Sequence, residues 1–113
     1  EMQEYKVILT WEAVYDITQI AEYIETKFGR ERADQFQYDI QQEIEKLGYQ
    51  TERFLKTQLF YRNYAIHKKP FSPSIIFYVK IEFTDEIHVL RVLREERNWE
   101  KMLEKQQKYT YPE

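Results

Sequence analysis

Residues 87–99 read IHVLRVLREERNW, and this stretch decides how the rest of the chain is arranged. Its first half favours a β-strand that is apolar at almost every position, and such a strand requires cover on both faces. Arg91 interrupts the apolar run. Because an unpaired buried charge is too costly, we expect Arg91 to pair with a carboxylate or to point into an open groove. Arg94 and Arg97 follow at the exit of the strand, and Trp99 begins another apolar pattern.

The composition is that of one ordinary globular domain. The 113 residues are 42% hydrophobic and 33% charged, so we take 1–113 as one domain with loose ends at 1–4 and 107–113. A net charge of −3 and a pI of about 5.5 argue against a dedicated binder of naked nucleic acid. The chain has no cysteine, which excludes disulfides and thiolate metal sites and fits a reducing cytoplasm. No apolar run approaches the roughly 20 residues of a membrane span, so no membrane partner is expected.

The charges are unevenly distributed along the chain. Residues 1–56 hold seven Lys/Arg and twelve Asp/Glu, whereas residues 57–113 hold ten Lys/Arg and eight Asp/Glu. The simpler interpretation is a solvated acidic face on the helices of the first half. The alternative is a basic working surface in the second half.

The first half predicts a strand followed by two helices. Residues 5–10 alternate as a short strand, and Thr10 is placed to cap the helix that follows. Apolar residues then recur at three- and four-residue steps up to Gly29, and again from 33 to 47 before Gly48. Because the connection at Gly29 is short, the two helices are expected to form an antiparallel hairpin.

The second half predicts three strands and one helix. Prolines break the pattern at 69–73, because proline cannot donate to a sheet ladder. The expected elements are a loop over 49–58, strands at 59–68, at 74–81 and from 87 onward, a turn at 83–86, and a helix over about 95–106.

These elements give an α+β fold with the order β-α-α-β-β-β-α. The last three strands form an antiparallel meander because their connections are short, and the first strand pairs with a sheet edge. The helical hairpin must cover one face of the small, mainly antiparallel sheet, because its apolar stripes have nothing else to bury against. The other face is then expected to be a groove, with the short last helix at one end. From the placement of charge, we expect this groove to be the working surface and to be lined by Arg62, Lys68, Lys69, Arg91 and Arg94.

Three segments carry a resemblance to a known family. Residues 5–10 (YKVILT) with Ala13 look like the family's opening strand and helix start, 75–79 (IIFYV) like its "IFY" strand, and 89–93 (VLRVL) before 97–100 (RNWE) like its closing signature. On these grounds the chain resembles the RelE/ParE superfamily of toxins from bacterial type II toxin–antitoxin modules, over nearly all of residues 5–103.

The chain departs from the nuclease members of that superfamily. Arg94 stands where the closing signature most often has histidine, and Ser74 stands where an arginine commonly opens the "IFY" strand. The pair of strand lysines typical of those nucleases is only faintly echoed by Lys68 and Lys69. The resemblance therefore implies the fold more firmly than the nuclease chemistry.

Metal-independent RNA cleavage would require a base for the ribose 2′-hydroxyl, cations for the phosphorane and an acid for the leaving oxygen. His67 or His88 would transfer protons, although a strand histidine is more often structural. The alternative for Arg94 and Arg97 is local pairing with Glu95 and Glu96, and Trp99 is more often a core residue than a stacking platform. The candidate catalytic residues are Arg62, His67, Arg91 and Arg94, and the candidate target-binding residues are Lys68, Lys69, Arg97, Trp99 and Tyr64.

No cofactor or metal is expected. Two histidines, no cysteine and scattered carboxylates do not have metal-ligand spacing, and the two glycines at helix ends leave none for a phosphate-binding loop.

The resemblance implies three alternative functions. The first is a toxin that inhibits growth until a cognate antitoxin neutralises it, and the acidic charge balance favours a ParE-like inhibitor of DNA gyrase. The second is a RelE-like endoribonuclease acting on mRNA in the translating ribosome. The third is a non-toxic member that only binds the antitoxin. In all three, operator DNA would be contacted only through the antitoxin.

Overall fold

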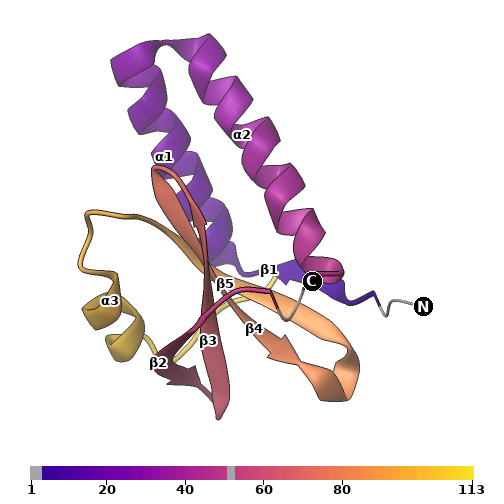
Figure 1. Cartoon of the computed structure of the whole chain (residues 1–113). Helices are drawn as coiled ribbons and strands as arrows, with labels where there is room; N and C mark the ends of the chain where they lie inside the picture. The colour runs from indigo at the N-terminus through magenta and orange to yellow at the C-terminus, as the bar shows by residue number, and fades with distance from the viewer. Residues whose placement is uncertain (1–3, 51–52) are drawn as a thin grey trace.

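The computed structural model describes residues 4–50 and 53–113, which form one mixed sheet with a helical hairpin and a short third helix (Figure 1). The expected looseness of residues 1–3 lies outside the described residues. The elements are β1 (Lys6–Leu9), α1 (Trp11–Phe28), α2 (Arg30–Glu45), the 3₁₀ turn η1 (Lys46–Gly48), β2 (Lys56–Tyr61), β3 (Tyr64–Phe71), β4 (Ser74–Ile81), η2 (Glu82–Thr84), β5 (Glu86–Arg94) and α3 (Trp99–Lys105).

The sheet has the strand order β1-β5-β4-β3-β2. Strand β1 runs parallel to β5, and the other neighbours are antiparallel. The first strand therefore pairs beside the last strand, and β2 to β5 form a meander. The predicted α+β class and the helical hairpin on one face are confirmed.

The prediction of a single strand over 59–68 was wrong. The chain reverses at Arg62 and Asn63, which have positive φ angles of 51° and 73° and join β2 to β3. Two such residues form the tight turn that matches the twist of a hairpin. Such a turn is usually recognised in a sequence by Asn-Gly or Asp-Gly. Because this turn contains no glycine, the sequence pattern did not indicate it. The observed order is β-α-α-β-β-β-β-α. Strand β2 begins at Lys56, so the last three residues of the predicted loop at 49–58 belong to a strand.

The expected break at 69–73 is also narrower than predicted. Strand β3 continues through Pro70, which lies opposite Ile75 of β4. Strand β2 begins opposite His67, so at Pro70 the strand has a neighbour on one side only. A proline is tolerated at such an edge because its missing backbone N–H would have no neighbouring strand to donate to.

Two residues join the helices to their neighbours. The Thr10 hydroxyl accepts from the backbone N–H of Ala13 at 3.0 Å and donates to the carbonyl of Leu90 at 2.8 Å. The predicted cap is thus confirmed, and the same hydroxyl ties α1 to β5. Gly29 alone connects α1 to α2, with φ 99° and ψ 166°, a conformation that is essentially restricted to glycine.

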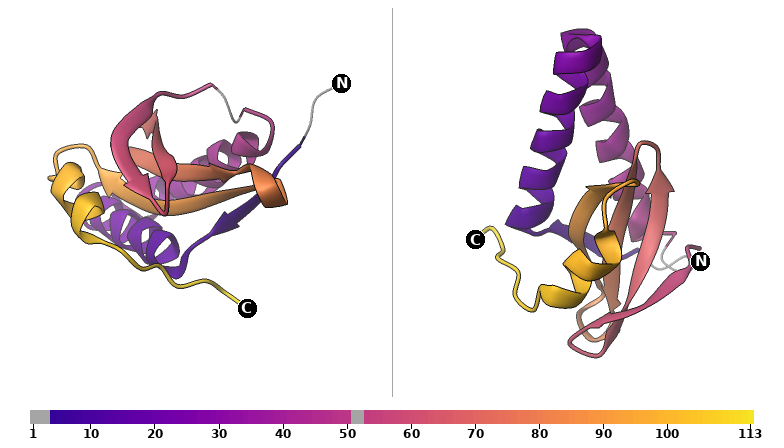
Figure 2. Two further views of the ribbon diagram at one scale, coloured as in Figure 1. Left: turned by 90° about the horizontal axis from the view of Figure 1, so that it is seen from below. Right: turned by 90° about the vertical axis from the view of Figure 1, so that its left-hand side faces the viewer.

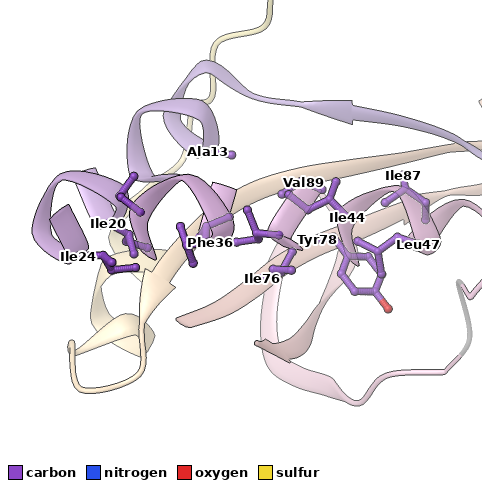
Figure 3. Packing of buried hydrophobic residues seen from close by; sticks show 14 residues of the cluster. Ala13, Ile20, Ile24, Phe36, Ile44, Leu47, Ile76, Tyr78, Ile87 and Val89 are labelled. Atoms are coloured by element: carbon purple, nitrogen blue, oxygen red, sulfur yellow. The ribbon is translucent and has the colours of Figure 1, made fainter. Parts of the chain in front are cut away.

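The main core lies between the helical hairpin and the sheet (Figure 3). Alternate residues of β4 and β5 face the apolar stripes of the two helices, as the periodicity predicts. The buried members shown in the figure include Ala13, Ile20, Ile24, Phe36, Ile44, Leu47, Ile76, Tyr78, Ile87 and Val89.

A second core covers much of the opposite face of the sheet, so the groove expected there is reduced to a hollow of about 350 Å³ lined by Tyr61, Arg62, Tyr64, Ile81, His88 and Tyr111. Phe77 and Leu90 of the sheet pack with Leu103 of α3 and with Tyr109. Apolar residues at almost every position of β4 and β5 require this second cover. Helix α3 is also shorter than predicted, because residues 95–98 form a turn before it begins at Trp99.

The predicted loose end at 107–113 is likewise not what the structure shows. The tail runs back from α3 to the start of α1 (Figure 2), where Thr110 accepts from the backbone N–H of Trp11 at 2.8 Å. The Glu12 carboxylate accepts from both the backbone N–H and the hydroxyl of Thr110, each at 3.0 Å. The Tyr109 ring packs edge-on against Tyr61. The tail is therefore part of the folded domain.

Replacing Gly48 by alanine is expected to destabilise the domain. A Cβ at this position would lie 2.7 Å from the carbonyl oxygen of Tyr5, which must shift. We expect Gly48→Ala to lose about 1–3 kcal/mol of unfolding free energy in urea denaturation. Gln42→Ala, an exposed change on α2, serves as the control. An unchanged denaturation midpoint for Gly48→Ala would show that the close approach is not maintained.

Candidate functional site

Arg91, the cation at the centre of β5, is held by a carboxylate. Its Nε donates to Oδ2 of Asp16 at 2.6 Å, and its second terminal nitrogen donates to Oδ1 at 2.9 Å. A third nitrogen donates to the side-chain oxygen of Gln106 at 2.6 Å. The expected pairing of Arg91 is thus confirmed. A guanidinium engaged in this way is not free to bind a phosphate.

A β-bulge in β5 immediately precedes Arg91. Phe77 pairs with Arg91 and Tyr78 pairs with Val89, which leaves Leu90 as the extra residue of β5. Because directly paired residues share a face, the bulge places Arg91 on the face of Phe77, whereas regular alternation from Val89 would place it on the hairpin face. The Asp16 carboxylate also accepts the backbone N–H of Val92 at 2.9 Å, so it ties the bulged strand to the helix.

The electrostatics of this pair favour the charged form of Arg91. The hydrogen bonds that Arg91 donates to Asp16 raise the pKa of Arg91 against the opposing effect of burial. The side chains of Asp16 and Arg91 are only 7% and 16% exposed. Removal of either partner would leave a buried charge uncompensated.

His67 and Lys69 lie on the hairpin side of the sheet and are buried. His67 stacks on Tyr78 with centroids 4.9 Å apart, and its Nδ1 lies 3.0 Å from the carbonyl oxygen of Phe54. Lys69 Nζ contacts the Glu43 carbonyl at 2.7 Å and the Glu43 carboxylate at 3.0 Å. Burial lowers the pKa of Lys69, opposed by its hydrogen bond to Glu43. Lys69 thus joins α2 to the sheet, and His67 joins the segment before β2 to the sheet.

The other predicted site residues are spread over the second face and the far turn. Lys68 Nζ lies 5.2 Å from the ring centroid of Trp99, which packs on Phe77 within the second core. Tyr64 belongs to the same core at the start of β3. Arg62 lies in the β2–β3 turn over the ring of Tyr61. The predicted groove lined jointly by Arg62, Lys68, Lys69, Arg91 and Arg94 therefore does not form.

Arg94 and Arg97 are the predicted cations that the structure brings together. Both line a cavity of about 110 Å³ between α1 and the exit of β5. The Arg94 guanidinium lies 3.8 Å from the ring centroid of Tyr23 and pairs with Glu96. No histidine is among the described residues that line this cavity.

A larger groove adjoins this cavity and shares Tyr23 and Arg94 with it. Its volume is about 560 Å³, and it lies between the helical hairpin and the β3–β4 turn. Phe28 is 59% exposed at its edge. The groove is lined by Tyr23, Ile24, Phe28, Arg32, Gln35, Phe36, Asp39, Phe71, Ser72, Pro73, Arg94 and Glu95.

Sequence reasoning missed the groove and the partner of Arg91. Phe28 and Phe36 fall on helix stripes and read as ordinary core residues. Phe71 lies next to prolines and reads as part of a loop. Asp16 falls outside the apolar stripe of α1, next to the stripe residue Ile17, and was therefore assigned to the solvated face. A buried arginine in the strand was the only signal that such a carboxylate was needed.

His88, the second histidine, holds the C-terminal tail. Its Nδ1 lies 2.9 Å from the Tyr111 hydroxyl, and its Nε2 lies 2.9 Å from the Glu86 carboxylate. The hydrogen bond from His88 lowers the pKa of Glu86. Burial raises the pKa of Tyr111 to about 12. The contacts of His88 therefore hold the C-terminal tail against the sheet and do not indicate a catalytic role.

Two searches of the described residues were negative. No group of three or more His, Asp or Glu in residues 4–50 and 53–113 is placed to hold a metal ion. Over the same residues, no helix has the length and apolar character needed to cross a membrane.

Comparison with known proteins identifies the class of protein to which this fold belongs. A family model described as "ParE toxin of type II toxin-antitoxin system, parDE" matches residues 7–99. The chain belongs to this family of toxins. A solved chain of the chromosomal ParDE TA system from P. aeruginosa is similar, with a TM-score of 0.67 and 17% identity, over 81% of this chain and 97% of that one. A comparison with curated protein sequences gave no match.

Removing Asp16 is expected to destabilise the domain strongly. Asp16→Ala leaves Arg91 uncompensated and Val92 without its acceptor, so we expect a loss of about 3–5 kcal/mol in urea denaturation. Asp16→Leu combined with Arg91→Met should recover much of that loss. Glu22→Ala, an exposed change on the same helix, is the control. A loss below about 1 kcal/mol, typical of an exposed ion pair, would contradict a structural role for the pair.

The tail is expected to loosen at alkaline pH. The folded-state pKa of Tyr111, about 12, lies above the value of roughly 10 for an unfolded chain. The unfolded state therefore loses this proton first, and the contribution falls as pH rises from 10 towards 12. Unfolding free energies of Tyr111→Phe should decline less steeply over this window than those of the unmodified protein. Parallel declines would exclude Tyr111 as the cause.

Proposed function

We propose that this toxin inhibits growth by binding DNA gyrase, without catalysing a reaction of its own, and that a cognate antitoxin neutralises it by occupying the groove. The observation that carries the first part is the placement of the cations. Arg91 is paired with Asp16 and Lys69 with Glu43. His67 is buried under its own contacts. The groups that RNA cleavage would require are used in packing.

The dispersal of the remaining cations supports the same proposal. Lys68 and Arg62 lie on separate parts of the structure from Arg94 and Arg97. Cleavage by the 2′-hydroxyl route needs a base, an acid and cations around one phosphate. A toxin that acts by binding its target needs only a complementary surface.

The groove supports the antitoxin part of the proposal. Its apolar lining from Ile24, Phe28, Phe36, Phe71 and Pro73 remains accessible in the single chain. An apolar groove bordered by charged residues is typical of surfaces that receive an amphipathic helix or an extended segment. Such a partner would cover the hydrophobic surface that the isolated toxin leaves exposed.

The proposed target is tested by two assays on the purified protein. In a supercoiling assay with gyrase and relaxed plasmid, we expect loss of supercoiling as the protein is added, because it blocks the enzyme. In a cell-free translation reaction, we expect the mRNA to remain uncut. Addition of the antitoxin first should restore supercoiling, which serves as the control.

Two outcomes would overturn the proposal. Discrete cuts in the translated mRNA, lost in a folded Lys68→Ala variant, would make the protein a ribosome-dependent endoribonuclease. Normal supercoiling and intact mRNA, together with tight antitoxin binding, would make it a non-toxic regulatory member. Arg91→Ala is unsuitable for deciding between these outcomes, because it removes the partner of Asp16.

A further inference from the structure

The cavity at the exit of β5 is lined by an arginine whose hydrogen-bonding capacity is not filled. The Nε atom of Arg94 is buried and has no partner among the described residues. A buried donor without an acceptor is destabilising by about 1–3 kcal/mol, and by more when it is charged. The cavity of about 110 Å³ that Arg94 lines is large enough for a small oxygen-bearing group. An acceptor that binds this guanidinium would offset part of that cost.

The charges around the cavity favour an anion. Both oxygens of Asp16, which borders it, already accept bonds from Arg91 and from the backbone of Val92. Glu96 pairs with Arg94 from a side chain that is more than half exposed. Arg97 adds a second guanidinium to the lining. Guanidinium groups bind oxyanions through strong, directional hydrogen bonds.

The adjoining groove indicates which kind of molecule brings the anion. Tyr23 and Arg94 belong to both hollows, so one ligand can occupy them together. The groove is largely apolar, and the carboxylates of Asp39 and Glu95 also line it. A nucleic-acid backbone would be repelled by these acids and would gain little from the aromatic lining. A polypeptide with apolar side chains beside one acidic residue fits both hollows.

We propose that Arg94 and Arg97 form a carboxylate-binding subsite for the antitoxin. One Asp or Glu of the antitoxin enters the cavity and accepts hydrogen bonds from the guanidinium groups of Arg94 and Arg97, and neighbouring apolar side chains of the same segment fill the groove. This subsite rests on the proposed role of the groove in antitoxin binding. Arginine suits position 94 because its guanidinium stacks on Tyr23 while the residue also lines the cavity.

Affinity measurements test the subsite. The antitoxin is the product of the adjacent open reading frame, and its binding is measured by titration calorimetry at two salt concentrations. We expect Arg94→Gln to weaken binding about tenfold or more, as for loss of a charged hydrogen bond, and to reduce the dependence on salt. Arg97→Gln should weaken it less. Arg62→Gln, another arginine stacked on a tyrosine but at the far turn, should bind as the unmodified protein does.

A charge exchange identifies the partner residue. Arg94→Glu should abolish tight binding, and one Asp→Arg or Glu→Arg change in the antitoxin should restore it at least tenfold. Circular dichroism confirms that each toxin variant is folded before titration. Failure of every acidic position to rescue Arg94→Glu would overturn the subsite.

The remaining outcomes separate the subsite from the proposed function. If the unmodified toxin binds the antitoxin and Arg94→Gln binds equally well, the subsite is wrong while the antitoxin pairing stands. If the unmodified toxin does not bind the antitoxin, the pairing itself fails. If a DNA oligonucleotide displaces the antitoxin from the unmodified toxin but not from Arg94→Gln, the cavity binds phosphate and the carboxylate assignment is overturned.

Discussion

The ion pair between Asp16 and Arg91 is the interaction on which the arrangement of the elements depends. It joins the first helix to the last strand across the whole sequence, and Gln106 extends it to the C-terminal segment. The bulge at Leu90 places Arg91 beside Phe77 on the second face of the sheet, and its guanidinium reaches Asp16 of α1 from there. A pair of this kind contributes less to net stability than to specificity, because apolar residues of similar size often serve as well. Its effect here is to fix the position of α1 on the bulged strand.

Because Asp16 binds Arg91, this arginine is not available to stabilise charge on a substrate. Together with the burial of His67 and Lys69, this pairing leaves Arg94 and Arg97 as the predicted cations that share a cavity. They lie beside an apolar groove, far from the lysine that packs on Trp99 on the other face. In the closing segment that resembles the superfamily signature, the first arginine is therefore held in a structural ion pair, and the next two line the cavity. A toxin that acts by binding is the function that such a surface supports best.

The sequence predicted the parts of the fold that have strong periodicity or a defined cap. The two long helices, the cap at Thr10 and the glycine between the helices follow from local rules. The β2–β3 hairpin was missed because its turn uses Arg62 and Asn63 where glycine is the usual signal. The tail was missed because its binding depends on contacts with Glu12 and His88 that are distant in sequence. The site was predicted least well, since alternation assigns a strand residue to a face only while the register holds. The bulge places Arg91 in register with Lys68 across Phe77, but no pattern in the sequence showed that Asp16 binds its guanidinium.

Observation of arginine Nε–H resonances by NMR, during titration of the toxin with the antitoxin, tests the division of roles among the arginines most directly. The free protein should show Arg91 with slow hydrogen exchange, because Asp16 holds its Nε–H. Addition of the antitoxin should shift the Arg94 and Arg97 resonances and leave that of Arg91 nearly unchanged. A large shift of Arg91 with no change at Arg94 would contradict the account, because it would place the functional cation in the pair assigned here to structure.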